Sequence, residues 1–148
     1  MIHIYTDGAC LNNPGPGGWG ILVLKPNTPE PVVCSGGKKL TTNNQMELEA
    51  ALQALYWLKQ NAPTTPAIIY TDSMYVQQGI TEWIHGWKRK NWITASKTPV
   101  KNSELWKAID AAQLHLKVEW RWVKAHNGHT ENEKVDQIAR SQAISYRE

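Results

Sequence analysis

The sequence predicts an α/β domain in which helices lie on the faces of a mixed β-sheet, and three observations lead to this class. Strand-like apolar runs separated by Gly, Pro and Asn turns fill the first 40 residues. The hydrophobic period then changes to that of an amphipathic helix. A further strand-like run follows this helix, so it is expected to lie parallel to its neighbour. We expect one domain over residues 1–148, long enough to bury roughly 68–70% of its unfolded surface.

The first three strands are expected to form an antiparallel meander, because their connections are short. They are the runs IHIY, WGILVLK and PVVCSGGKKL. In the helix that follows, four leucines form one stripe, at positions 48, 52, 55 and 58. Thr42 followed by Gln45 matches a capping box, so this helix should begin near Asn43. The run AIIYTD is then the fourth strand.

The second half of the chain predicts helices around one more strand. A short helix, SMYVQQ, should stop at Gly79, and a partly helical segment rich in tryptophan and lysine follows it. We expect another helix over about 101–114. The run KVEWRWV alternates apolar with charged residues, as in a strand with one face in solvent. The last helix should begin at the capping box Thr130–Glu133 and reach about Ser145.

Composition argues against a membrane span and a disulfide framework. No apolar stretch approaches the ~18 residues that a span requires. Cys10 and Cys34 lie in strand-like segments without zinc-ligand spacing. We therefore expect a reduced, cytoplasmic protein.

The positive charge of the chain is concentrated in one segment. The net charge is +3, yet no acid lies between Glu82 and Glu104, where five of the 16 basic residues occur, namely Lys88, Arg89, Lys90, Lys97 and Lys101. The rest of the chain has 11 basic and 13 acidic residues. A localised basic surface predicts a polyanionic partner, although a merely solvated face would have the same composition.

The tetrapeptide IYTD occurs twice and places Asp7 and Asp72 where each strand is expected to end. If the two strands are parallel neighbours in register, both carboxylates emerge side by side at one edge of the sheet, because adjacent strands lie ~4.8 Å apart. Crowded carboxylates repel one another, and a divalent cation such as Mg²⁺ or Mn²⁺ removes that repulsion. Glu47 and Asp136, each in the second turn of a helix, could reach the same edge.

Each of these acids also has a purely structural interpretation. An aspartate after a strand commonly forms a turn or caps a helix, and Asp72 could cap the SMYVQQ helix. Glu47 and Asp136, taken singly, would be solvated helix residues. Spacing alone leaves the metal site and the structural roles both open.

Three other motifs favour ordinary structural roles. GPGGWG matches the GxGxxG pattern of dinucleotide-binding loops, but a strand follows it instead of a helix, so we expect a hairpin turn and no small-molecule cofactor. His126 and His129 could bind zinc, but no cysteine or third histidine supports this. Trp83 and Trp87 lie four residues apart and should pack at the base of the basic segment, with its lysines outward.

Four blocks occur in this order: DGACLNNPGPGGWG, TTNNQMELEAALQAL, YTDSMYVQQGITEWI and WVKAHNGHTENEKVDQIAR. Together they resemble type 1 ribonuclease H, especially the bacterial enzymes with a basic protrusion, over about residues 2–143. The resemblance implies the ribonuclease H-like fold, a five-stranded mixed sheet flanked by helices, with the protrusion inserted at about 82–101. It also implies a monomer that hydrolyses the RNA strand of RNA–DNA hybrids to 5′-phosphate and 3′-hydroxyl ends.

The resemblance further implies roles for individual residues. Two Mg²⁺ ions, or Mn²⁺ in their place, would be bound by four acids: Asp7, Glu47, Asp72 and Asp136. Asp7 would bridge the ions, and Glu47 would also sense the ribose 2′-OH. His126 would move protons or aid product release. The substrate-binding residues would be Asn13, Asn43, Asn44, Trp83, Lys88, Arg89, Lys90 and Lys97.

Three departures from the family pattern affect affinity and rate rather than the type of reaction. Met74 stands at a common glutamine, Gln45 at a frequent arginine, and Ala125 at a common glycine. Two rival functions are a module that binds hybrids or duplex RNA without cutting, and a related metal nuclease acting on DNA, such as an integrase or resolvase. The first leaves the four acids unexplained, and the second lacks the TTNNQMEL and HNGHTENEKVD blocks.

Overall fold

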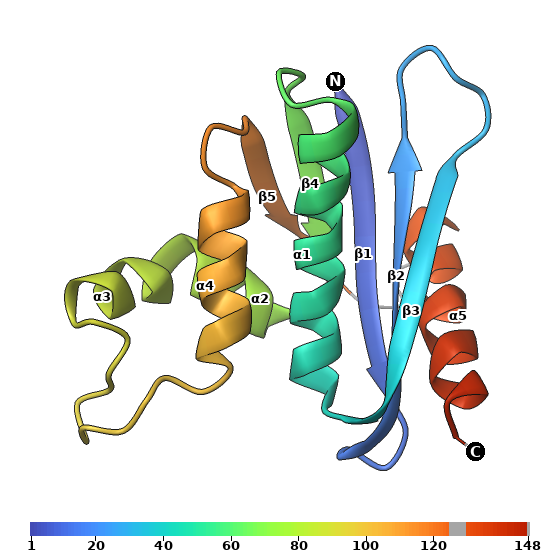
Figure 1. Cartoon of the computed structure of the whole chain (residues 1–148). Helices are drawn as coiled ribbons and strands as arrows, with labels where there is room; N and C mark the ends of the chain where they lie inside the picture. The colour runs from blue at the N-terminus through green and yellow to red at the C-terminus, as the bar shows by residue number, and fades with distance from the viewer. Residues whose placement is uncertain (125–129, 148) are drawn as a thin grey trace.

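The computed structural model describes residues 1–124 and 130–147, and its centre is a five-stranded sheet of order β3-β2-β1-β4-β5 (Figure 1). The strands are β1 (Ile2–Cys10), β2 (Gly15–Leu24), β3 (Val32–Thr41), β4 (Ala67–Thr71) and β5 (Val118–Trp122). The first three pair antiparallel, whereas β4 is parallel to β1 and β5 is parallel to β4. The predicted meander and the two parallel additions are therefore confirmed.

Helices cover both faces of the sheet. They are α1 (Asn43–Asn61), α2 (Met74–Gln78), the single π-helical turn η1 (Gly79–Trp83), α3 (Ile84–Arg89), α4 (Ser103–Ala112) and α5 (Thr130–Ser145). Helices α1 and α4 lie on one face, and α5 lies on the other, against β1, β2 and β3 (Figure 1). The leucine stripe of α1 is buried with Ile4 and Ile69 of the central strands, which forms the core.

The helix after Asp72 does not stop at Gly79, as the sequence predicted. The chain continues through η1 into α3, and Gly79 has ordinary right-handed helical angles, φ −61° and ψ −45°. A Cβ at this position would lie 2.0 Å from Cη2 of the buried Trp106. The glycine therefore serves close packing against α4 instead of helix termination.

The GPGGWG motif is not a hairpin turn but part of β2, which begins at Gly15. Glycine here lets a helix approach the sheet: a Cβ on Gly18 would lie 2.4 Å from the carbonyl oxygen of Ala139 and 2.5 Å from the amide of Ala143. Both contacts are with α5, so the small residues allow α5 to lie directly on the sheet. This contact helps to place the helix that carries Asp136.

The N-terminus of α1 has the predicted cap in part. Thr42 Oγ1 accepts a hydrogen bond from the Gln45 amide at 3.2 Å. The Gln45 side chain does not return to Thr42; it bonds to Thr41 at 2.7 Å and to Asn102 at 3.3 Å. The second half of the predicted capping box is therefore wrong, because tertiary partners compete for this amide.

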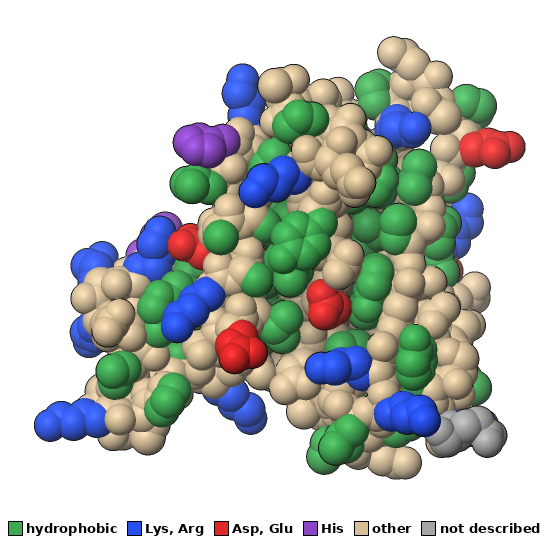
Figure 2. Space-filling view, in the orientation of Figure 1, with side chains coloured by type: hydrophobic (Ala, Val, Ile, Leu, Met, Phe, Trp, Pro, Cys, Tyr) green, Lys and Arg blue, Asp and Glu red, His purple; other side chains and the backbone are tan. Residues whose placement is uncertain are grey.

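The basic segment projects from the body of the protein at the left of Figure 1. Its tryptophans pack on one another and on α4: the ring centroids of Trp83 and Trp87 are 6.0 Å apart, and that of Trp87 is 5.3 Å from that of Trp106. Basic side chains are spread over the outside of this protrusion, as Figure 2 shows. The predicted packing at the base of the protrusion, with the lysines outward, is confirmed for Trp87, whereas Trp83 packs on Trp87 but is itself exposed.

Among the helices that the structure describes, none has the length and apolar character that crossing a membrane requires. Both cysteines are free thiols.

Candidate functional site

The two IYTD strands are in register, as predicted. Tyr5 of β1 pairs with Tyr70 of β4, and their rings stack 4.3 Å apart. The parallel ladder ends there, and Asp7 and Asp72 lie beyond it. Asp7 is nevertheless inside β1, because this strand continues to pair with β2 as far as Cys10. The expectation that Asp7 ends its strand is wrong: only β4 ends, and this opens the edge on which both acids meet.

Glu47 reaches this edge from α1. Its side chain is buried, with a residue exposure of 6%, and its Oε1 accepts a hydrogen bond from the Gly8 amide at 3.0 Å. The close approach depends on the missing side chain of Gly8, since a Cβ there would lie 2.4 Å from the Glu47 amide nitrogen. Glu47 is therefore no solvated helix residue. Among the described residues, Asp7, Glu47 and Asp72 each place a carboxylate oxygen within 4.8 Å of the others.

Asp136 lies at the margin of this cluster. Its Oδ2 is 3.3 Å from Arg140 Nε, one helical turn along α5, and its side chain is 27% exposed. Alongside burial, it also contributes to the raised pKa of Asp7. A cavity of about 370 Å³ beside the acids is lined by both residues of this ion pair together with Gly8 and Asn43. Asp136 is thus paired with Arg140 and lies outside the group of Asp7, Glu47 and Asp72.

The buried acids resist ionisation in the absence of a cation. Burial, and then the neighbouring Asp72 and Asp136, raise the pKa of Asp7 to about 9. Burial, followed by the charges of Asp7 and Asp72, raises the pKa of Glu47 well above its usual value. Within the described part of the chain, Asp72 Oδ1 is buried and has no hydrogen-bond partner. Crowded carboxylates with an unused buried oxygen fit a divalent cation with oxygen ligands.

These shifts predict how the metal-free protein responds to pH. Asp7 titrates near 9 in the folded state and near 4 in the unfolded chain. The folded state therefore holds protons that the unfolded state has released, so the free energy of unfolding should fall as pH rises through this window. We expect a loss of a few kcal/mol between about pH 5 and 9 in urea unfolding with a chelator. Asp7→Asn should flatten the slope, and an equal slope in both proteins would contradict the assignment.

The structural alternative for Asp72 is wrong. The cap of α2 is Ser73, whose Oγ accepts from the Val76 amide at 3.2 Å. Asp72 is held by its backbone instead, since its carbonyl accepts from Trp122 Nε1 at 3.0 Å. Its carboxylate is left free to join the cluster.

The proposed substrate-binding residues form two groups. Near the acids, Asn13 Oδ1 accepts from the Asn43 amide at 3.0 Å at the start of α1, where Asn44 follows. On the protrusion, Trp83 is 37% exposed, and the lysines and arginine are exposed. They comprise Lys88, Arg89, Lys90 and Lys97. Lys88 is already paired with Asp110 at 3.2 Å. His126, His129 and Ala125 lie outside the described residues.

Sequence reasoning missed Gly8, Ser73 and Arg140. A glycine inside a strand often marks a close backbone approach, and this signal was present directly after Asp7. Arg140 follows Asp136 by four residues, the spacing of a helical ion pair. Ser73 is a strong capping residue before an apolar helix. All three signals lie beside acids that the sequence did identify.

Comparison with known proteins gives one consistent result. A family model described as RNase H matches residues 1–144. A protein of Cereibacter sphaeroides named ribonuclease H is 56% identical over 144 residues, which covers 95% of this chain and 93% of the relative. A ribonuclease H of Bradyrhizobium diazoefficiens is 56% identical over 147 residues, covering 99% and 92%.

Solved structures agree. LC9-RNase H1, described as a type 1 RNase H with the type 2 active-site motif, superposes with a TM-score of 0.86 at 32% identity, covering 98% of this chain and 72% of that one. LC11-RNase H1, solved in complex with an RNA/DNA hybrid, has a TM-score of 0.73 at 20% identity and covers 98% of each chain, which supports the fold alone.

Proposed function

The chain belongs to the ribonuclease H family, and on this premise we propose that it cuts the RNA strand of RNA–DNA hybrids internally by two-metal-ion catalysis. The observation that carries the proposal is the buried cluster of Asp7, Glu47 and Asp72, with carboxylate oxygens within 4.8 Å of one another. Nothing in the stability of the fold accounts for three acids placed together under mutual repulsion. A role of these three acids in binding divalent cations does account for their placement.

The acids would hold two divalent cations, Mg²⁺ or Mn²⁺, which would activate the attacking water and neutralise charge on the leaving oxygen. Asp7, whose pKa is raised by burial and by both Asp72 and Asp136, would be a ligand common to the two ions. Glu47 and Asp72 would complete the inner ligand set. Asp136, paired with Arg140, would be the more loosely held ligand.

The residues around the acids fix their positions. The Gly8 amide orients the Glu47 carboxylate, so that its other oxygen can face a ligand or a ribose 2′-OH, the group that distinguishes RNA from DNA. Hydrolysis forms a bond from water oxygen to phosphorus and breaks the bond from phosphorus to O3′. The 3′ oxygen gains a proton, leaving 5′-phosphate and 3′-hydroxyl ends. His126, which the resemblance assigns to proton movement, would act here.

Hybrid binding would use the amides near α1 and the cations of the protrusion. Contacts from exposed lysines and arginine to phosphates carry no sequence information and weaken steeply with salt. Asn13 and Asn43, joined at 3.0 Å, would meet the nucleic acid beside the acids. The basic surface on the protrusion in Figure 2 would then follow the nucleic-acid backbone away from the site of cleavage.

A direct test is cleavage of an end-labelled RNA–DNA hybrid with Mg²⁺, with and without chelator. We expect internal RNA cuts with 5′-phosphate ends, and no cutting of duplex DNA or duplex RNA. Salt-sensitive binding without turnover would favour a binding module, and cleavage of duplex DNA would favour an integrase-like or resolvase-like nuclease. Either outcome would defeat the proposal.

A further inference from the structure

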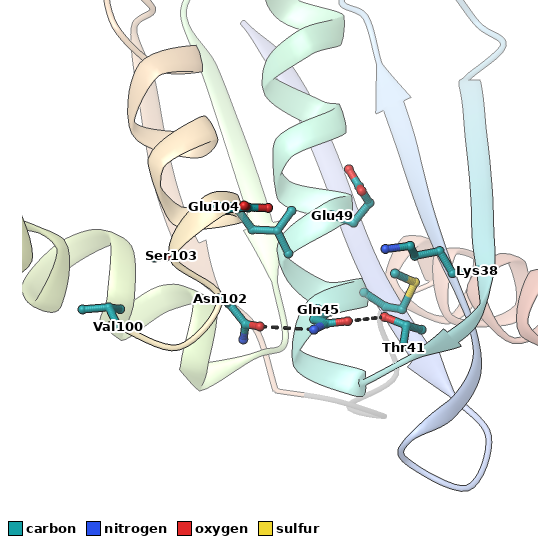
Figure 3. A pocket seen from close by; sticks show the side chains of 10 residues that line it. Lys38, Thr41, Gln45, Glu49, Val100, Asn102, Ser103 and Glu104 are labelled. Carbon is teal, nitrogen blue, oxygen red and sulfur yellow. Dashed lines mark hydrogen bonds between the residues drawn. The ribbon is translucent and has the colours of Figure 1, made fainter. Parts of the chain in front are cut away.

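A chain of side-chain hydrogen bonds runs from the end of β3 to the base of the protrusion. Thr41 Oγ1 donates to Gln45 Oε1 at 2.7 Å, and Gln45 Nε2 donates to Asn102 Oδ1 at 3.3 Å; Figure 3 shows both links. Asn102 Nδ2 then donates to the Tyr75 hydroxyl at 3.1 Å. Trp106 Nε1 donates to the same hydroxyl at 3.2 Å. These five residues form one connected network across β3, α1, α2 and α4.

The network crosses a cavity at the starts of α1 and α4, whereas farther along the two helices pack together in the hydrophobic core. A cavity of about 490 Å³ separates the start of α1 from the start of α4, and Gln45 and Asn102 line it from opposite sides (Figure 3). Across this cavity, dispersion contacts do not fix the spacing of the two helix starts. The amide-to-amide bond therefore has a larger part in setting that spacing than it would in a packed interface.

The backbone at the centre of the network suits this role. Asn102 has a left-handed conformation, φ 60° and ψ 29°, directly before α4. Asparagine tolerates this conformation better than most residues. Its side chain accepts from one neighbour and donates to another, so both ends of the amide are used. The turn into α4 is thus tied to α1 and to α2 together.

Two members of the network lie close in sequence to the acids. Gln45 is two residues before Glu47 on α1, and Tyr75 is three residues after Asp72. The Tyr75 ring contacts Trp83 of the protrusion, with centroids 5.9 Å apart. The network therefore joins α1, which supplies Glu47, to Trp83 at the base of the basic protrusion.

We propose that Gln45, Asn102 and Tyr75 are positioning residues that hold the basic protrusion in register with the carboxylate cluster and thereby determine affinity for the hybrid. This inference rests on the proposed hybrid-binding function. Gln45 stands where the family frequently has an arginine. Its neutral amide can accept and donate hydrogen bonds at once, which an arginine side chain cannot do.

The test compares Gln45→Met and Tyr75→Phe, singly and together, with the parent protein. Each change removes hydrogen bonds while keeping shape, so KM for the hybrid should rise about three- to tenfold with kcat within twofold. The KM of the double variant should be little higher than that of the weaker-binding single variant, because either change interrupts the same network. Hybrid affinity in chelator, followed by fluorescence anisotropy, should fall in parallel, whereas Mg²⁺ affinity measured by calorimetry should not change.

Gln53→Met is the matched control, because Gln53 is also on α1 but bonds within the helix, to Glu49. Its KM should equal that of the parent. Single-variant KM values within twofold of the parent, losses that multiply in the double variant, or a fall in kcat instead of a rise in KM would each overturn the inference. A parent protein that neither binds nor cuts hybrids would defeat the proposed function instead.

Discussion

Replacing Asp7 by asparagine should abolish hybrid cleavage and at the same time raise the melting temperature of the metal-free protein. Asp7 is 3% exposed and lies among Glu47, Asp72 and Asp136. Loss of a central ligand should reduce the rate by roughly a thousandfold or more, since partners outside a ligand shell already account for about 10–100-fold. The neutral amide also removes the cost of a buried acid whose pKa is raised to about 9.

The gain in stability can be bounded from the same shift. Each pKa unit corresponds to about 1.4 kcal/mol, so relief at neutral pH is on the order of a few kcal/mol. For a chain of this size each kcal/mol moves the melting temperature by about 3 °C. We expect an increase of about 5 °C or more in chelator, measured by calorimetry, and a much smaller rise on addition of Mg²⁺ than in the parent.

Asp110→Asn is the matched control, because Asp110 is the aspartate outside this group of acids and pairs with Lys88 on the surface. It should leave cleavage within a few-fold of the parent and leave the Mg²⁺-dependent rise in melting temperature intact. An Asp7→Asn protein that melts below the parent in chelator would mean that the acids are not under mutual repulsion.

The clustering of Asp7, Glu47 and Asp72 could be predicted from the sequence, because a local pattern has a long-range consequence. Two identical strand segments imply that their aspartates face the same way if the strands pair in register, and Tyr5 does pair with Tyr70. Glu47 could be placed near the edge because it lies beside the buried stripe of α1. In both cases the periodicity of one element predicts the direction of a side chain, and the topology of the fold brings those side chains together.

The predictions that were wrong share a different cause. Gly79 resembles a helix stop, but whether glycine ends a helix depends on what packs against it, here the ring of Trp106. Gln45 has the spacing of a capping box, but Asn102, 57 positions along the chain, takes its amide. Such competition between local and distant partners cannot be predicted from a short stretch of sequence, because it depends on which residues the fold brings together.

Gly8→Ala should disable the site without removing any acid. The added methyl group would lie 2.4 Å from both the Glu47 amide nitrogen and the Met46 carbonyl carbon, so the start of α1 must move away from β1. A displacement of about 1 Å at a catalytic centre can cost ~100-fold in rate. We expect cleavage to fall by about this factor, Mg²⁺ affinity to weaken in calorimetry, and stability to fall by roughly 1–3 kcal/mol from overpacking.

The same substitution elsewhere separates a steric cause from a general effect of removing glycine. A Cβ on Gly86 in α3 would meet no atom within 4 Å, and alanine is favoured over glycine in a helix by about 1 kcal/mol. Gly86→Ala should therefore stabilise the protein slightly and leave Mg²⁺ affinity unchanged. Because Gly8→Ala retains every carboxylate, its loss of activity would show that the acids work only when α1 lies this close to β1. Cleavage by Gly8→Ala at the rate of the parent would mean that the distance between Glu47 and Asp7 does not limit the reaction.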